Sequence, residues 1–448
     1  MKKVEQWSLL YEILRPFGRF IFWMAHRKIV VTGTENIPKG EPVIMAPNHQ
    51  NALSDDLAMV FYLKQQPVFL GRADMFKNKT AAKLLNFLKV IPVFRIRDGK
   101  DTLDRNKAVY ENCVQILKQN KTICIYPEAG DNRMKSMIGH KKPIPRIAFY
   151  AAEATNFEMD VKVVPVGMYY SHYYHFRREL YIAFGKPISS KDYYKLFREE
   201  GEAKAINKFR NDLFEAIRKL IVHVPDKKSY DLYDSGFEMF RAKVLEKLGL
   251  KNHLKNKVKA EQYLSEKINE ALENEETEKD DLLKKSQTYK RLKKRFNFNE
   301  KELAKGEIGV SGFIANMLLA IILLPIAAYG TLANGWLFYL TRFPYRKKIK
   351  DDHFYSTISY GLSFILFPLW FIGQYFILHS IFDSWLIAIG LLIFSIPSGV
   401  VAWEIGQLIL STFHRLKYNQ LQKTSNKLFK QLLDIRIELI RFFTKTIG

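Results

Sequence analysis

The sequence reads Ala46-Pro47-Asn48-His49-Gln50-Asn51-Ala52-Leu53-Ser54-Asp55 between a short apolar run, Pro42–Met45, and a helical run, Leu57–Leu63. A His and an Asp therefore stand at a strand end, beside the start of a helix. A His side chain takes up a proton near neutral pH, so it can act as a general base. An Asp that accepts from the other ring nitrogen fixes the tautomer and stabilises the imidazolium. We therefore predict that His49 is a catalytic base and that Asp55 is its partner.

Strand-like apolar runs recur around this segment and alternate with helical stretches. The runs cover residues 28–31, 42–45, 68–70, 90–94, 122–126, 161–166 and 180–184, and the clearest helical stretches cover 79–88, 105–119 and 145–154. Strands alternating with helices at this spacing favour a sheet covered by helices. We predict an α/β domain over residues 27–225, with His49 at the end of one of its strands.

Two further segments place charged residues at or near the ends of predicted strands. Ile91-Pro92-Val93-Phe94-Arg95-Ile96-Arg97 carries two arginines that share one strand face. Tyr126-Pro127-Glu128-Ala129-Gly130-Asp131-Asn132-Arg133 follows the next strand. A planar guanidinium can hold a phosphate through two parallel hydrogen bonds.

Taken in order, these segments resemble the glycerophosphate acyltransferases, the family that includes the lysophosphatidate acyltransferases. The family signature is Asn-His followed after four or five residues by Asp, and five residues separate His49 from Asp55 here. That spacing is similar to longer members that extend into C-terminal membrane helices. Asp56 is the alternative partner for His49. The resemblance covers roughly residues 25–225.

The resemblance also implies a set of substrate-binding residues. They are Asn48, Arg95, Arg97, Glu128, Gly130 and Arg133. In the family an Arg of the Ile-Pro-Val block binds the acceptor phosphate, and the Glu block shapes the acceptor site. Ala129 stands where the family has Gly, and Gly permits backbone angles that Ala disfavours. The sequence of this loop therefore departs from the family pattern at a position that affects its backbone conformation.

The composition narrows the class of partner. The formal net charge is +24, which suits phosphate substrates or anionic lipid head groups. We find no zinc-finger spacing and no nucleic-acid recognition motif, so nucleic acid is not an expected partner. The two cysteines, Cys113 and Cys124, fit a reducing compartment and form no metal-ligand spacing. We expect neither a metal nor a bound cofactor.

Five parts follow from the distribution of charge and apolar residues. We predict an amphipathic N-terminal helix over 1–26, kinked or broken near Pro16 and Gly18. The acyltransferase-like domain over 27–225 is followed by a charged helical linker over 226–308. A membrane region over 309–410 precedes an amphipathic tail over 411–448, which we expect at the membrane surface.

Three uncharged runs form the predicted membrane region, at 311–341, 354–382 and 384–403. A helix of about 20 residues spans the hydrocarbon core. Basic residues lie before the first run, after it and after the third, and cytoplasmic loops are rich in Lys and Arg. We therefore predict a multi-pass membrane protein with its catalytic domain on the cytoplasmic face. The first run would then enter and return as a re-entrant hairpin near Pro325–Gly330, the alternative being one long tilted helix.

These features predict an O-acyltransferase. The donor would be an acyl thioester of coenzyme A or acyl carrier protein, and the expected acceptor is 1-acylglycerol 3-phosphate, which gives phosphatidate. Backbone N–H groups near the start of the helix after His49 are candidates to stabilise the oxyanion. Two alternatives stay open: glycerol 3-phosphate as the acceptor, and a non-catalytic lipid-binding protein on the same fold.

Overall fold

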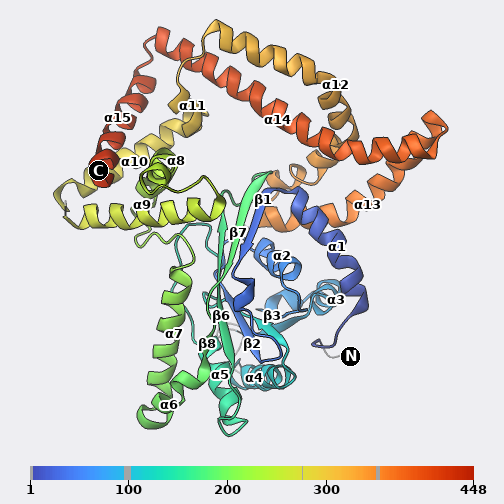
Figure 1. The fold of residues 1–448 in the computed structure, drawn as a ribbon, viewed down its shortest axis with the longest axis vertical. Coiled ribbons are helices and arrows are strands. Elements are labelled where there is room, and N and C mark those ends of the chain that lie inside the picture. The colour runs from blue at the N-terminus through green and yellow to red at the C-terminus, as the bar shows by residue number, and fades with distance from the viewer. Residues whose placement is uncertain (1–3, 95–101, 275, 350–353) are drawn as a thin grey trace. The chain divides into compact units, whose positions relative to one another are not determined.

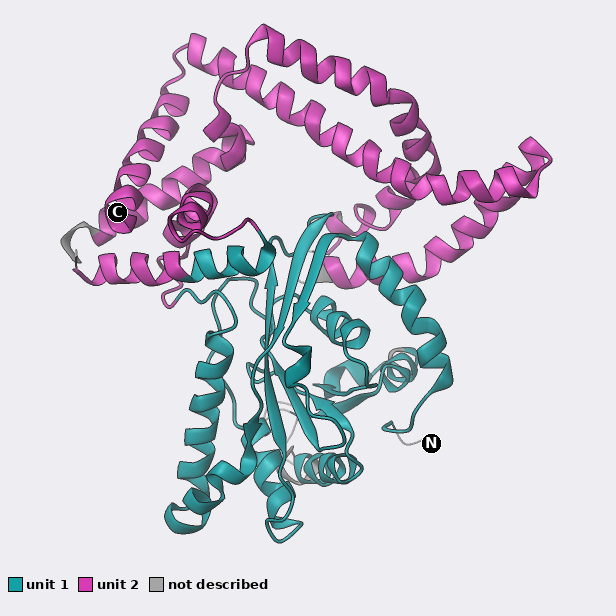
Figure 2. Ribbon diagram, viewed as in Figure 1, with its two compact units in different colours: residues 1–224, 253–262 teal, residues 225–252, 263–448 magenta. Residues whose placement is uncertain are grey.

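The computed structural model describes residues 4–94, 102–274, 276–349 and 354–448 (Figure 1). It divides into two compact units (Figure 2). Unit 1 comprises Met1–Val224 and His253–Gln262, and unit 2 comprises Pro225–Asn252 and Tyr263–Gly448. Each unit is described by itself below.

Unit 1 is built on a mixed sheet of eight strands. The strands are β1 (His26–Thr32), β2 (Val43–Pro47), β3 (Val68–Arg72), β4 (Val90–Val93), β5 (Thr122–Cys124), β6 (Lys162–Tyr170), β7 (Arg178–Phe184) and β8 (Ile188–Ser189). Their order is β1-β7-β6-β2-β5-β3-β4, with β8 also paired to β6. β2 lies parallel to both β5 and β6, while β7 and β8 run antiparallel to β6. The predicted α/β class and all seven predicted strands are confirmed.

Helices cover the sheet of unit 1. They are α1 (Leu9–Met24), α2 (Leu53–Tyr62), α3 (Lys79–Phe87), α4 (Thr102–Lys118), α5 (Pro143–Glu153), α6 (Tyr194–Glu200) and α7 (Glu202–Arg218). Ile44, Ala46, Ile123 and Val163 of the sheet belong to one buried cluster with residues of α4, α5 and α7. Alternate residues of a strand face opposite sides, so β2 is covered on both faces, and all five of its residues are buried. This burial fixes the strand end from which His49 projects.

Helix α1 runs as one helix through Pro16, so of the predicted kink or break the break is wrong. A proline removes a single intrahelical hydrogen bond, and α1 is anchored by other contacts. Arg15 donates to the carbonyls of Leu63, Lys64 and Gln65 at the end of α2. Large apolar side chains are exposed on α1 and just before it: Trp7, Leu9, Leu10, Ile13, Leu14 and Trp23. The predicted amphipathic character is therefore present.

Unit 2 contains a helical bundle where a solvated linker was expected. Its members are α8 (Tyr230–Lys247), α9 (Leu254–Asn274, the first residues of which belong to unit 1), α10 (Glu276–Phe296), α11 (Glu300–Lys305) and α15 (Lys427–Ile447). Phe237, Tyr289 and Phe443 are fully buried in this bundle. The apolar residues of α15 pack on α8 and α10, as the ring contact of Phe240 with Phe443 shows. Most of its apolar face is therefore covered by protein, and the place of the tail at a membrane surface stays a prediction.

Three helices of unit 2 are long and apolar enough to cross a membrane. They are α12 (Val310–Leu340), α13 (Phe354–Phe382) and α14 (Trp385–Lys423). The predicted hairpin is wrong, because α12 is one helix that contains Pro325. Gly330 serves a different purpose: a Cβ atom there would lie 2.2 Å from the carbonyl oxygen of Ser398, so glycine lets α12 approach α14 closely. A small residue that permits this approach is common where apolar helices pack.

Because α12 is one continuous helix, the predicted membrane topology changes. A single crossing by α12 would carry Arg342 and Lys348 to the side opposite Arg291 and Arg295. The basic segments then no longer share one side of the bilayer. The orientation of the catalytic domain therefore rests on the basic residues that precede α12.

Candidate active site

His49 follows β2 directly and is tied to the first turn of α2. Its Nδ1 lies 2.8 Å from Oδ2 of Asp55, whose side chain is fully buried. The same carboxylate oxygen accepts the backbone N–H groups of Gln50 and Asn51, each at 2.8 Å. Three donors on one oxygen fix the loop between strand and helix. The two residues predicted as a pair are thus in direct contact.

This contact determines which nitrogen of His49 can take a proton. Because Nδ1 faces the carboxylate, it carries the hydrogen, and Nε2 of the neutral ring holds the free lone pair. The side chain is 18% exposed, so the ring is not sealed from solvent. Burial lowers the pKa of His49, but the hydrogen bond and charge of Asp55 outweigh it and raise the pKa to about 8.

Tyr126 and Glu128 hold His49 from the neighbouring strand end, after β5. The Tyr126 ring stacks on the His49 ring, with centroids 4.0 Å apart and planes 24° from parallel. One oxygen of Glu128 accepts the N–H of His49 at 3.0 Å, and the other accepts the N–H of Ile138 at 2.7 Å. Burial raises the pKa of Glu128 to about 7, against the lowering effect of these hydrogen bonds. Glu128 therefore fixes the backbone around His49 as well as the following loop.

The loop after Glu128 forms with alanine in the place of glycine. Ala129 adopts φ +53°, the left-handed region, and Gly130 does not have a positive φ. The left-handed conformation costs an L-residue roughly 1–2 kcal/mol, so the backbone of this loop is strained at Ala129.

We expect Ala129→Gly to stabilise the protein by about 1 kcal/mol, because glycine adopts positive φ without this cost. The matched control is Gly130→Ala, whose added Cβ would meet no atom within 4 Å and should be nearly neutral. Thermal unfolding in detergent would show a higher midpoint for Ala129→Gly alone. An unchanged or lower midpoint would contradict the assignment of strain to this residue.

Asn48 has a structural role that differs from its predicted one. It is fully buried, its Nδ2 donates to the carbonyl of Met168, and its Oδ1 accepts the N–H of the same residue. Both polar ends of the side chain are thus engaged by β6. Asn48 thus holds the His49 segment against the neighbouring strand, and its predicted contact with substrate stays a prediction.

Four backbone N–H groups near the start of α2 are also engaged. Those of Gln50 and Asn51 donate to Asp55, and those of Ser54 and Asp55 donate to the carbonyls of Asn51 and Ala52. These four groups therefore stabilise the turn into α2, and the stabilisation of an oxyanion by other N–H groups near the start of this helix stays a prediction.

The loop of residues 130–138, here termed the acceptor loop, lies beside His49. The N–H of Asn132 donates to the carbonyl of His49 at 3.0 Å, and Gln50 donates to the carbonyl of Met134 at 3.1 Å. Arg133 and Gly130 belong to this loop and are partly buried. The loop thus carries one of the predicted phosphate ligands. Arg95 and Arg97, the other two, lie outside the described residues.

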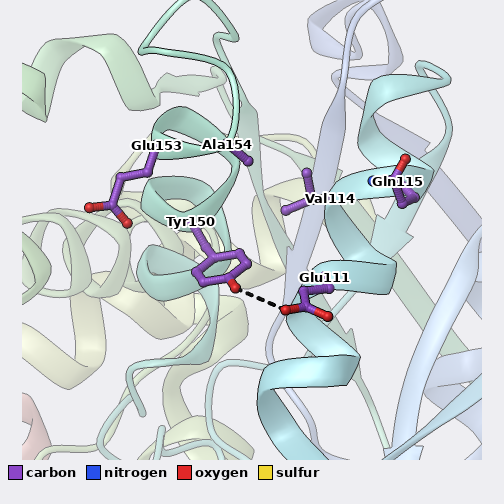
Figure 3. A pocket seen from close by; sticks show the side chains of 6 residues that line it. All are labelled: Glu111, Val114, Gln115, Tyr150, Glu153 and Ala154. Atoms are coloured by element: carbon purple, nitrogen blue, oxygen red, sulfur yellow. Dashed lines mark hydrogen bonds between the residues drawn. The ribbon is translucent and has the colours of Figure 1, made fainter.

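Sequence reasoning missed Tyr126, which was noted only as part of a motif. The signal was its position two residues before Glu128, since alternate residues of an extended strand end share a side. The structure also shows a recess between α4 and α5 that is separate from these residues (Figure 3). It is lined by Glu111, Val114, Gln115, Tyr150, Glu153 and Ala154, and contains no residue of the His49 site. Within the described residues no group of three or more His, Cys, Asp or Glu side chains is arranged to hold a metal.

Residues 28–169 match the family model described as Acyltransferase. This range contains His49, Asp55, Tyr126 and Glu128. This part of the chain is similar to the acyltransferase family. The expected resemblance is therefore confirmed for the domain that carries His49 and Asp55.

Known proteins similar to the acyltransferase domain include a 1-acyl-sn-glycerol-3-phosphate acyltransferase of Borreliella burgdorferi, 27% identical over 125 residues. That match covers 28% of this chain and 48% of the relative. An uncharacterized acyltransferase of Schizosaccharomyces pombe is 26% identical over 121 residues, which cover 26% of this chain and 18% of that protein. The chain thus spans about half or less of these curated relatives. A crystal structure of the 1-acyl-sn-glycerophosphate acyltransferase PlsC from Thermotoga maritima is 19% identical and has a TM-score of 0.34, covering 47% of this chain and 77% of that one.

Proposed function

We propose that the protein is a membrane O-acyltransferase that moves a fatty acyl group from a thioester to the free hydroxyl of 1-acylglycerol 3-phosphate, giving phosphatidate. The observation that carries this proposal is the His49–Asp55 pair, with Nε2 of His49 left to receive a proton, in a domain similar to the acyltransferase family. The similar protein of Borreliella burgdorferi is a 1-acyl-sn-glycerol-3-phosphate acyltransferase, which supports this choice of acceptor.

In the proposed reaction, Nε2 of His49 removes the hydroxyl proton as the acceptor oxygen attacks the thioester carbonyl. The new C–O bond forms, the C–S bond breaks, and the departing thiolate receives the proton from His49. Asp55 stabilises the imidazolium that forms in between. The substrate brings its own nucleophile, so no covalent acyl-enzyme is required.

The acceptor phosphate positions this hydroxyl. We assign it to Arg133 of the acceptor loop together with Arg95 and Arg97, because a guanidinium holds phosphate in a fixed geometry. Coenzyme A or acyl carrier protein would present the acyl group. Neither a metal nor another cofactor takes part in this scheme.

The membrane assignment is supported by α12, α13 and α14 and by the exposed apolar side of α1. Helices of this kind would keep the site at the bilayer, where a lyso-lipid and its diacyl product reside. We place the acyltransferase domain on the cytoplasmic side, because exposed basic residues such as Arg291, Lys294 and Arg295 precede α12.

The acceptor is tested by offering 1-acylglycerol 3-phosphate and glycerol 3-phosphate in parallel, each with labelled acyl-CoA and acyl carrier protein donors in mixed micelles. Phosphatidate formed from the lyso-lipid supports the proposal. Product from glycerol 3-phosphate alone would place the enzyme one acylation earlier. No product with any pair would favour the non-catalytic lipid-binding alternative.

Activity should rise with pH and level off above about 8. His49 acts as a base only when neutral, and Asp55 raises its pKa to about 8. Glu128, with a pKa near 7, accepts its two N–H bonds best when ionised, which adds to the same trend. The measurement is kcat/KM between about pH 5.5 and 9.5, the range in which His49 and Glu128 both titrate. The rate of spontaneous thioester hydrolysis is subtracted at each pH. A maximum near the acid end, with activity falling toward pH 8, would contradict the assignment of His49 as the base.

A further inference from the structure

Glu261 is a fully buried carboxylate far along the chain from the catalytic segments. It lies on the part of α9 that belongs to unit 1, drawn in the same colour as the sheet in Figure 2. One of its oxygens lies 2.6 Å from Nζ of Lys135, and the other accepts the hydroxyl of Tyr169 at 2.9 Å. The Lys135 ammonium also lies 5.0 Å from the centre of the Tyr169 ring. Three elements of unit 1 thus meet at one carboxylate.

Lys135 belongs to the acceptor loop, between two residues that are tied to the His49 segment. The carbonyl of Met134 accepts Gln50, and the carbonyl of Ser136 accepts Asn132, which in turn donates to His49. The side chain of Lys135 is only 12% exposed. Its ion pair therefore pins the middle of the loop on which Arg133 lies.

Tyr169 lies next to Met168, which exchanges two hydrogen bonds with Asn48, the residue before His49. Glu261 consequently holds both the loop that carries the phosphate ligand and the strand that supports the catalytic base. The first turns of α9 are fixed to the same unit by two further contacts. Lys257 pairs with Glu179 at 2.7 Å, and Gln262 donates to the carbonyls of Lys219 and Ile221.

A buried ion pair seldom adds much net stability, because the cost of desolvation offsets the attraction. Such pairs do define geometry, and binding sites need their supporting side chains to hold the contacting groups within fractions of an ångström. We propose that Glu261 is a positioning residue that, through Lys135 and Tyr169, sets the placement of the acceptor loop relative to His49 and so determines affinity for the phosphate of the acceptor. This inference rests on the proposed function.

The test compares Glu261→Gln with Glu266→Gln, an exposed glutamate on the same helix. The first variant should raise KM for 1-acylglycerol 3-phosphate by about 10–100-fold, as expected for a misplaced binding group, with little change in KM for the thioester. The second should match the wild type. An unchanged acceptor KM in folded Glu261→Gln would overturn the proposal, as would an equal rise for both substrates.

A further variant separates positioning from the unpaired charge that the substitution leaves behind. The double variant Lys135→Met/Glu261→Gln removes both the ammonium and the carboxylate, so no buried charge is left without its partner. If KM stays high in this double variant, the carboxylate is needed for geometry; a return to the wild-type KM would overturn the proposal. Should Glu261→Gln fail to fold, Tyr169→Phe removes only one hydroxyl and should raise acceptor KM in the same direction.

Hydrogen exchange gives a readout that does not depend on activity. Amides of residues 130–138 should exchange faster in Glu261→Gln than in Glu266→Gln, while those of β2 and β5 keep their protection. If the wild type transfers no acyl group, the proposed function fails, and this experiment alone decides the role of Glu261. Faster exchange confined to the loop would support positioning, and unchanged exchange would overturn it.

Discussion

Alanine in place of His49 is expected to lower kcat for acyl transfer by about 10²–10⁴-fold, the usual contribution of a positioned general base. The fold should survive, because Asp55 would still accept the N–H groups of Gln50 and Asn51 that hold the turn into α2. The stacking contact with Tyr126 is lost, but the His49 side chain is partly exposed and leaves no sealed cavity.

The measurement for this variant is kcat with saturating donor and acceptor, beside a thermal unfolding midpoint in detergent. His253→Ala, an exposed histidine of unit 1, is the matched control and should keep full activity. Full activity in His49→Ala would refute the mechanism. Loss of activity accompanied by unfolding would call for His49→Gln, which is closer in size and cannot act as the base.

Asparagine in place of Asp55 should have an effect of similar size, about 10³–10⁴-fold in kcat, the order seen when a carboxylate that orients a catalytic histidine is neutralised. The neutral side chain stabilises the developing imidazolium less. It also removes the influence that raises the pKa of His49 to about 8, so the rise of kcat/KM with pH should move to lower pH. A lower kcat together with this shift of the pH profile is specific to the loss of the Asp55 charge.

Asp56→Asn is the informative comparison, because Asp56 was the alternative partner from the sequence. Its carboxyl lies in the same turn of α2, and burial raises its pKa to about 6. We expect a much smaller loss of kcat and little movement of the pH profile. A larger effect for Asp56→Asn than for Asp55→Asn would assign the partnership to Asp56.

Local patterns were sufficient to predict the sheet and the central pair. Each of the seven predicted strands is a short run rich in apolar residues, and β8 escaped notice because it has only two residues. His49 and Asp55 are six positions apart, so a strand, a turn and the start of a helix bring them together. Interactions of this range follow from the sequence itself.

Long-range contacts were not predictable in the same way. Lys135 and Glu261 are 126 positions apart, and Tyr169 and Glu261 are 92 apart, so no local pattern marks them. The contact of Asn48 with Met168 was not predicted for the same reason, since Met168 lies on a strand that only the sheet order brings alongside. The error over α12 has another origin. Pro325 and Gly330 were interpreted as the turn of a hairpin. In the structure, α12 accommodates Pro325, and Gly330 allows close packing against α14.

The most direct test of the central claim is a rapid-quench measurement of thiol release from an acyl thioester, with and without 1-acylglycerol 3-phosphate. Direct attack by the acceptor hydroxyl, with His49 as the base, predicts thiol release only when the acceptor is present, equal to the phosphatidate formed and lost in His49→Ala. A stoichiometric burst of thiol without acceptor, leaving an acylated protein, would contradict the account.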